Sequence, residues 1–316
     1  MKKLIKKLLI FILPVLVVLY PLDLVITKGL KKTRYEEFAE WNAILNGEVE
    51  ADMVIMGGSR AFVHFSPEIL DSSLQLNAYN LGMDGYLFPM QQARFDAYLE
   101  QNDKPRYVLQ SVSMSTLSRR NGLYSREQFL PYLDNEKVLM ATKAYEGLSW
   151  FDYNVPLLRY RKQWDLITIG ATESLGVRHI SGNEKHKGYV GRSRSWDGTF
   201  EKFVENSPEG IVADVEEEVV MAFESYLKRC KENDIQVILV YTPEFEGIQR
   251  YFVNRAEVMG IYQRLATKFD LEFLDYSADP MCSDQTFFYN SQHMNKSGAE
   301  KFSRKLAGDL KEIVAN

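Results

Sequence analysis

The sequence predicts an α/β protein in which a parallel sheet carries helices on both faces. Short apolar runs typical of buried strands alternate along the chain with longer stretches of helical spacing. This alternation indicates βαβ units, whose strands are parallel and covered on both sides. An apolar share of 46% over 316 residues suffices for one large core or two smaller ones. Ligands are therefore expected at the carboxyl ends of the strands.

The first half of the sheet begins at residues 52–56, an apolar run that stops at Gly57 and Gly58. Ser66 and Pro67 have the residue types of a helix cap and a first helical position. The following elements are expected in order: a strand within 77–82, a helix over 88–101 and a strand over 106–112.

The same alternation resumes in the last hundred residues. We expect a helix over 215–233, a strand over 235–241 that stops before Pro243, a helix over 256–269 and a strand over 271–275. The final helix has Asn295 as its cap. One stripe of this helix is apolar and consists of Ala299, Phe302, Leu306, Leu310 and Ile313.

Residues 118–214 show no clean alternation. This segment is aromatic and locally basic, for example in Arg159-Tyr160-Arg161-Lys162 and around Arg192 and Arg194. We interpret it as an insertion that folds over the active edge of the sheet. Its basic loop suits an anionic glycan or a lipid head group, or else it is a solvated surface.

The N-terminal residues 1–34 differ from the rest of the chain. Four lysines precede residues 8–27, which are almost wholly apolar and long enough to cross a bilayer core of about 30 Å. No small-residue cleavage site follows. We predict an uncleaved signal anchor over 1–34 and an α/β domain over 35–316 that faces the periplasm or the cell exterior. A buried core helix is the alternative.

Composition excludes several classes of protein. A net charge of −5 and a pI near 5.6 argue against nucleic-acid binding, which needs a basic face. His179 and His186 have no acidic partners at a metal-ligand spacing, and Cys230 and Cys282 do not form a Cys-x-x-Cys pattern. No Gly-Lys phosphate loop occurs. The sequence therefore predicts neither a metal nor a cofactor.

Ser59 and His293 are candidates for nucleophilic acyl chemistry. Ser59 follows the first strand and two glycines, which allow a sharp turn with backbone N–H groups that converge on an oxyanion. His293 precedes the last helix, so both residues are expected at the same sheet edge. A neutral imidazole activates serine when an acceptor holds its other nitrogen. Asn290 stands three residues before His293, and Asp284 and Asp275 are alternative acceptors.

Two further polar residues follow Ser59 closely. Arg60 is suited to bind a substrate carboxylate or to pair with a nearby acid, and both interpretations stay open. His64 is more typical of a packed or solvated histidine than of a catalytic base.

Three blocks resemble those of SGNH hydrolases. Gly57-Gly58-Ser59-Arg60 resembles the nucleophile block, Asn80-Leu81-Gly82 the glycine block, and His293-Met294-Asn295 with Gly298-Ala299 the histidine block. The resemblance implies a three-layer α/β/α sandwich with a flavodoxin-like sheet. It also implies Ser59 as nucleophile, His293 as base, and the N–H groups of Ser59 and Gly82 as oxyanion donors. It covers residues 50–117 and 210–316.

The chain is most similar to membrane-anchored envelope proteins of this superfamily, such as the D-alanine transfer protein of teichoic-acid modification and the alginate O-acetylation proteins. That similarity implies a single-pass protein of the bacterial cytoplasmic membrane, an acylated envelope glycan or polymer as substrate, and a membrane-bound O-acyltransferase as partner. Two positions depart from the pattern. Asn290 replaces the family's aspartate, and the third block has no clear match around Gln110, Ser111 and Ser113.

These observations support two functional hypotheses. The first is a membrane-anchored serine esterase or O-acyltransferase that acts on envelope acyl esters outside the cytoplasm. The second is a catalytically inactive relative that binds or scaffolds a membrane-bound O-acyltransferase. Asn290 is the residue that distinguishes them.

Overall fold

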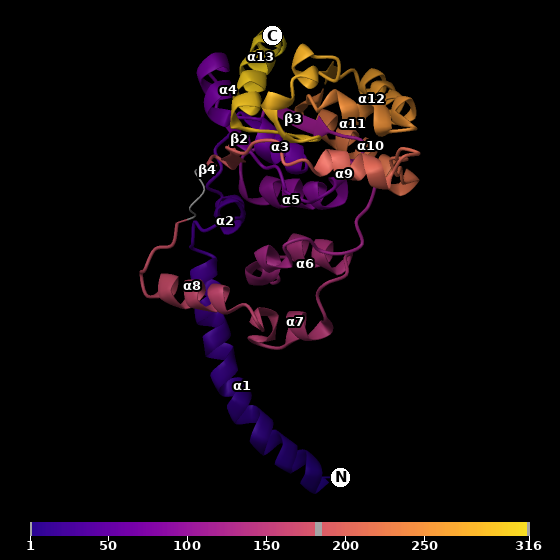
Figure 1. The fold of residues 1–316 in the computed structure, drawn as a ribbon. Helices are drawn as coiled ribbons and strands as arrows, with labels where there is room; N and C mark the ends of the chain where they lie inside the picture. The colour runs from indigo at the N-terminus through magenta and orange to yellow at the C-terminus, as the bar shows by residue number, and fades with distance from the viewer. Residues whose placement is uncertain (1, 181–184, 315–316) are drawn as a thin grey trace. The chain divides into compact units, whose positions relative to one another are not determined.

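A computed structural model describes residues 2–180 and 185–314, without the side chains of 2–13, 15 and 16 (Figure 1). The chain forms two compact units. The helical unit comprises residues up to 46 together with 121–182, and the sheet unit comprises 47–120 and 183–316. Each unit draws on two separate stretches of sequence.

The sheet unit is built on five parallel strands, as the sequence predicts. Their order across the sheet is β2-β1-β3-β6-β7, which is the 2-1-3-4-5 order of flavodoxin-like folds. The central pair is aligned with Val54 opposite Val108. The strands are β1 (Met53–Met56), β2 (Ala78–Asn80), β3 (Tyr107–Val112), β6 (Gln236–Tyr241) and β7 (Glu272–Asp275).

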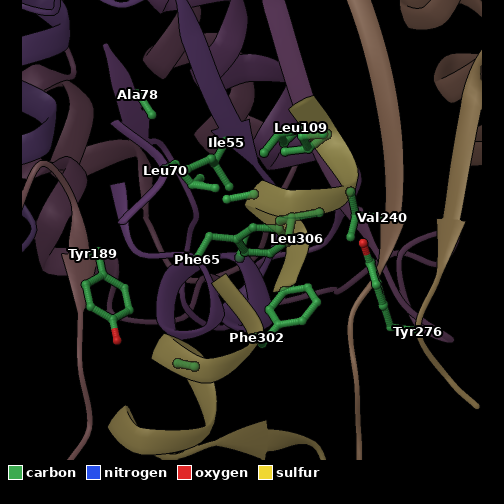
Figure 2. Close-up of a cluster of buried hydrophobic side chains, with 14 of the residues drawn as sticks. Ile55, Phe65, Leu70, Ala78, Leu109, Tyr189, Val240, Tyr276, Phe302 and Leu306 are labelled. Carbon is green, nitrogen blue, oxygen red and sulfur yellow. The ribbon is translucent and has the colours of Figure 1, made fainter. Parts of the chain in front are cut away.

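Helices cover both faces of this sheet. On one face, α4 (Pro67–Leu74) and α13 (Lys296–Val314) pack on alternate strand residues such as Ile55, Leu109 and Val240. Figure 2 shows these residues meeting Phe302 and Leu306 of α13. On the other face lie α5 (Phe88–Gln101), α10 (Glu217–Glu232) and α12 (Arg255–Phe269). The prediction of an α/β fold with a parallel sheet is confirmed.

The predicted helix ends agree with the structure to within a residue or two. Asn295 caps α13, because its side-chain oxygen accepts the N–H of Gly298 at 3.0 Å. The apolar stripe of α13 faces inward, and Ala299, Phe302 and Leu306 are fully buried.

Several short elements were not predicted. The sheet unit also contains α3 (Ser59–His64), β4 (Lys185–His186), β5 (Tyr189–Val190), α9 (Thr199–Asn206), α11 (Glu246–Tyr251), the 3₁₀ turns η3 (Pro280–Ser283) and η4 (Gln285–Phe287), and the hairpin β8 (Phe288–Asn290) and β9 (His293–Met294). None is long enough to produce a clear hydrophobic period. Two of them, α3 and the β8–β9 hairpin, carry the candidate catalytic residues.

The helical unit combines the N-terminal residues with part of the predicted insertion. It contains α1 (Lys2–Leu30), α2 (Phe38–Leu45), η1 (Arg126–Tyr132), α6 (Glu136–Lys143), α7 (Trp150–Asn154), η2 (Leu158–Tyr160) and α8 (Trp164–Ser174). The insertion predicted over 118–214 is thus divided, because residues 183–214 belong to the sheet unit.

Helices α1 and α8 cross in close contact at two glycines. A Cβ atom built on Gly29 would lie 1.8 Å from the carbonyl oxygen of Gly170, so only glycine fits there. Next to this crossing, the buried Asp23 pairs with Arg159 at 2.5 Å. Asp23 also accepts the N–H of Leu157.

The predicted membrane anchor over residues 1–34 finds no support in the described residues. Among them, no helix has both the length and the apolar character needed to span a bilayer. The side chains of residues 1–13, 15 and 16, on which that prediction largely rests, lie outside the described part of the chain.

Candidate active site

Ser59 is the first residue of α3, directly after β1 and two glycines. Gly57 has a φ of +147°, and a Cβ atom there would lie 2.8 Å from the Cβ atoms of Ala61 and Ser111. A residue with a side chain is excluded from this turn by both conformation and space. The turn holds the half-buried Ser59 at the carboxyl edge of the sheet, beside the switch point between β1 and β3.

His293 reaches Ser59 from the β8–β9 hairpin. Its Nε2 atom lies 2.7 Å from Ser59 Oγ, although the two residues are 234 positions apart. This distance is within the range expected between a nucleophile and its base. The hairpin explains the placement, because β9 positions His293 immediately before α13.

Asn290 holds the other nitrogen of the His293 ring. Asn290 Oδ1 lies 2.9 Å from His293 Nδ1 and also accepts the backbone N–H groups of Gln292 and His293, at 3.1 and 2.9 Å. Because both backbone groups are donors, the atom that faces them is the amide oxygen and not the nitrogen. An oxygen there requires hydrogen on Nδ1, which leaves the lone pair of Nε2 facing the Ser59 hydroxyl. Asn290 therefore selects the tautomer that a general base needs.

The two alternative acceptors have other partners. Asp284 is exposed and accepts hydrogen bonds from the N–H and hydroxyl of Thr286. Asp275 is exposed and accepts the N–H of Ser277. The structure brings Asn290 to His293 and directs both aspartates elsewhere.

The environment of His293 favours its neutral form. Burial, together with the nearby Arg60 guanidinium, lowers the pKa of His293 to about 4, against a weaker opposing effect of Asp197. Tyr289 stacks on the imidazole with the rings 5.5 Å apart and nearly parallel. The imidazole is thus a weak base, and at neutral pH it is uncharged, with its hydrogen on Nδ1 and none on Nε2.

Arg60 is buried and pairs with an acid. Its Nη1 atom lies 3.0 Å from Glu244, and its Nε atom donates to Thr242 Oγ1 at 2.9 Å. Glu244 in turn accepts the hydroxyl of Tyr241. Of the two interpretations of Arg60, the structure displays the ion pair. The partners Thr242 and Glu244 follow β6, and their position after a strong strand was the available signal in the sequence.

His64 is a buried residue that links α3 to the hairpin. Its Nε2 atom accepts the N–H of Met294 at 2.9 Å, so its hydrogen is on Nδ1, which donates to Thr242 Oγ1 at 2.8 Å. Burial and the charge of Arg60 hold the pKa of His64 well below its usual value. His64 fixes β9 beside α3 and, through it, the neighbouring His293.

Gly82 lies in close contact with α3. A Cβ atom on Gly82 would lie 2.5 Å from the N atom of Phe62. The N–H of Gly82 donates to Asn80 Oδ1 at 2.9 Å, so this proposed oxyanion donor is engaged by the side chain two residues before it. The N–H of Ser59 belongs to the first turn of α3, where backbone donors have no acceptor within the helix.

A cavity of about 470 Å³ opens beside Ser59. Its polar lining includes Ser111 near the end of β3, Ser113 and Thr116 after that strand, and Gln91 of α5. Apolar lining comes from Tyr86, Leu87, Met114, Ile211, Val212 and Phe252. The residues after β3 occupy the place of the unmatched third block, and 211–214 show that part of the predicted insertion does line the site.

Charged residues surround the ring that stacks on His293. The Arg194 guanidinium carbon lies 6.0 Å from the centre of the Tyr289 ring, and that of Arg192 lies 5.9 Å from the Phe62 ring. Burial raises the pKa of the nearby Asp84, although both arginines oppose this. Tyr289, Arg192 and Arg194 do not line the cavity beside Ser59. Within the described residues, His, Cys, Asp and Glu side chains form no cluster suited to a metal ion.

Comparisons with known proteins give matches among solved structures only. No family model and no curated protein matches the chain. One similar structure is a lipolytic protein of the G-D-S-L family from Desulfitobacterium hafniense, at 14% identity and a TM-score of 0.38 over 81% of this chain and 97% of that one.

A second is an acetyl xylan esterase, at 10% identity and a TM-score of 0.40 over 83% of this chain and 98% of that one. A third is the aryl esterase of M. smegmatis, at 10% identity and a TM-score of 0.36 over 82% of this chain and 98% of that one. At these identities and TM-scores the matches carry no argument about this chain, and its chemistry has to be argued from the site itself.

Proposed function

We propose that the protein is an SGNH-like serine esterase or O-acyltransferase. The observation that carries this proposal is the continuous chain of hydrogen bonds from Asn290 through His293 to Ser59, with the imidazole in the tautomer of a base. A serine and a histidine that met by chance would not be expected to have a third group fixing the ring.

The reaction would proceed through an acyl-enzyme. Ser59 Oγ attacks the ester carbonyl carbon while its proton passes to His293 Nε2, and the carbonyl oxygen takes the negative charge. When the tetrahedral intermediate collapses, the bond to the leaving alcohol breaks and Nε2 returns the proton to that alcohol. Water or a sugar hydroxyl then gives its proton to Nε2 and attacks the acyl carbon, and Nε2 passes that proton to Ser59 Oγ as the bond between Oγ and the acyl carbon breaks. Hydrolysis and transfer differ only in this acceptor.

The two sides of Ser59 suit the two parts of an ester. The proton of Nε2 goes to the leaving alcohol, so the alcohol and the acceptor belong on the side of His293, Tyr289 and Arg194. The cavity of about 470 Å³ lies at Ser59 without including His293 or Tyr289, and it has room for the acyl group. Tyr289 offers a flat aromatic surface to a sugar ring on the acceptor side.

The proposal includes attachment to the bacterial cytoplasmic membrane, with an acylated envelope glycan or polymer as substrate. Its support is the apolar sequence of residues 8–27 and the envelope proteins that the sequence blocks resemble. A membrane-bound O-acyltransferase would supply or receive the acyl group.

A second candidate function is an inactive scaffold for such an acyltransferase. Two observations favour it: the neutral Asn290 offers no charge to an imidazolium, and the Gly82 N–H is engaged by Asn80. An inactive protein has no need to keep the base tautomer of His293, and this distinguishes the two candidates.

The test is reactivity of Ser59 in the full chain. A fluorophosphonate probe should label the wild type and leave Ser59→Ala unlabelled, and p-nitrophenyl acetate hydrolysis should fall at least about a thousandfold in that variant. Ser225→Ala is the matched control, because the hydroxyl of Ser225 donates to the carbonyl of Met221 within α10 and Ser225 does not line the cavity. Equal labelling of wild type and Ser59→Ala would reject the enzyme and favour the scaffold.

A further inference from the structure

Exposed apolar side chains are concentrated in the helical unit. Of the seventeen large apolar side chains that are exposed in the described part of the chain, fourteen belong to this unit, although it is the smaller of the two. The sheet unit contributes only Val212, Met221 and Val253. Isolated exposed apolar residues need no explanation, but such an unequal distribution does.

Two groups of these residues lie on neighbouring elements. The first follows α1 and consists of Val17, Val18, Tyr20, Leu22, Leu24 and Val25, exposed by 43 to 65%. The second, here called the aromatic rim, consists of Trp150, Phe151, Trp164, Leu175, Val177 and Ile180, exposed by 54 to 82%.

The aromatic rim is fastened to the same turns of α1. Arg159 and Leu157, which follow α7, bind Asp23, and Tyr160 bonds to Thr27 at 2.8 Å. The hydroxyl of Ser174, directly before Leu175, donates to the carbonyl of Val25 at 2.6 Å. These bonds hold the rim segments against the turns of α1 that carry the exposed apolar residues, and Figure 1 shows α8 crossing α1.

The composition of the aromatic rim indicates what covers it. Tryptophan is enriched where one end of the ring meets hydrocarbon and the other meets water, and basic side chains beside it favour anionic head groups. Arg161, Lys162 and Arg178 are exposed between the rim residues. A protein interface would instead be depleted of lysine at its centre.

We propose that the aromatic rim docks on the surface of a lipid bilayer, with the indoles of Trp150 and Trp164 at the level of the head groups. Docking of this kind is interfacial and does not require any described helix to span the membrane. The inference extends the membrane attachment proposed above and is independent of the esterase chemistry. It gives residues 121–180 a role: they hold a lipid-binding surface around α1.

Brominated lipids test this directly. The full chain is reconstituted into vesicles of phosphatidylcholine and phosphatidylglycerol, with bromine on the upper acyl carbons of the phosphatidylcholine. Two of the four tryptophans are in the rim, so emission should fall by about half relative to vesicles without bromine. Trp150→Phe/Trp164→Phe keeps the ring character and should lose most of the quenching, whereas Trp196→Phe, in the sheet unit, should keep it. Unchanged melting of the variants confirms that they are folded.

Each other outcome contradicts the inference in a different way. Equal quenching of the wild type and the double variant would show that tryptophans outside the rim meet the lipid, and would reject docking by the rim. Flotation of the protein with vesicles, without quenching, would leave membrane attachment intact and reject the docking rim. A vesicle-free dimer that Trp150→Gln/Trp164→Gln dissociates, again without quenching, would show that a second copy covers the rim. Ser59→Ala should be quenched like the wild type, which separates this test from that of the esterase.

Discussion

The sheet unit and the helical unit each contain an arginine that is paired with a buried carboxylate, but the two pairs have different surroundings. Arg60 and Glu244 lie under the turn that carries Ser59, next to the hydrogen bonds of Thr242 and His64. Arg159 and Asp23 lie in a contact between η2 and α1, with no chemistry nearby. A buried ion pair is costly to desolvate and mainly fixes one arrangement of its neighbours. The comparison shows that an ion pair of this kind lies at the candidate site in one unit and at a contact with a helix in the other.

The largest expected difference between the two units comes from removing the proposed base, His293, from the sheet unit. His293→Ala should lower kcat/KM for p-nitrophenyl acetate by about ten-thousandfold or more, because Ser59 loses its proton acceptor. The melting temperature should change less than the activity, since the ring of His293 makes one hydrogen bond outside its own hairpin, to Ser59, and His64 still holds β9 beside α3. Activity measured against Ser59→Ala checks this, and hydrolysis above that background would show that another base serves Ser59.

Breaking either ion pair should destabilise its own unit, but only the loss of the pair in the sheet unit should also lower the esterase activity. Glu244→Ala leaves the buried Arg60 unpaired, at a cost of about 3 to 5 kcal/mol in unfolding free energy, and Asp23→Ala leaves the half-buried Arg159 unpaired at a smaller cost. Only Glu244→Ala should also lower kcat in the fraction that remains folded, through movement of Arg60 and Ser59. Denaturant titration together with active-site titration distinguishes these effects. A comparable loss of kcat in Asp23→Ala would mean that the helical unit supports the site.

Two glycine-to-alanine substitutions, one in each unit, should change the unfolding free energy by smaller amounts and with opposite signs. Gly170→Ala places a methyl group 2.5 Å from the carbonyl of Ile26 and should destabilise the α1–α8 crossing by about 1 to 3 kcal/mol. Gly260→Ala in α12 meets no atom within 4 Å and should stabilise the helix by up to about 1 kcal/mol. Thermal unfolding of both variants checks the signs. Equal effects at the two positions would show that the helical crossing is looser than described.

The smallest effect concerns the charge of residue 290, whose side-chain oxygen accepts the hydrogen bond from His293 Nδ1. The pKa of His293 is lowered to about 4, so the wild type should keep its base form and its activity down to about that pH and lose activity below it. Stability should also decline as the pH falls from the ordinary histidine pKa toward 4, because the unfolded chain takes up a proton that folded His293 rejects. Asn290→Asp adds a negative charge beside Nδ1, which raises the pKa and moves the acidic limb upward.

At neutral pH, Asn290→Asp should increase kcat by about tenfold, because the imidazolium formed in the transition state gains a counter-charge. The pH profile of kcat/KM for both proteins gives both quantities. An acidic limb at the same pH in both would show that Asn290 does not act on His293 through its charge state.

The sheet could be predicted because each strand is a short apolar run with its own stop signal. The runs before Gly57 and Pro243 and the cap at Asn295 depend on neighbours in the sequence, and the structure places these elements where the sequence does. Ser59 could likewise be found, because residues that come directly after parallel strands gather at the carboxyl edge of the sheet. Asn290 and His293 were found from their place before the last helix, although the β8–β9 hairpin that carries them was not predicted.

The helical unit could not be predicted, because its determinants are far apart in sequence. Nothing near Asp23 indicates that Arg159 neutralises it, and nothing near Gly29 indicates that Gly170 passes within contact distance. The sequence therefore suggests a single insertion, although residues 121–180 pack with the N-terminal helix and residues 185–214 with the sheet. The role of His64 was missed for the same reason, since its partners Thr242 and Met294 come from distant segments.

The pairing of Asp23 with Arg159 has a consequence for synthesis of the chain. The two residues are separated by 136 positions, so at about 5 to 20 residues per second the ribosome completes Arg159 roughly 7 to 27 seconds after Asp23. During that interval Arg159 is not available to the carboxylate, and three of the five strands are synthesised before Arg159. The nascent N-terminal helix must therefore be kept hydrated at Asp23, or held by another molecule, until translation supplies the arginine.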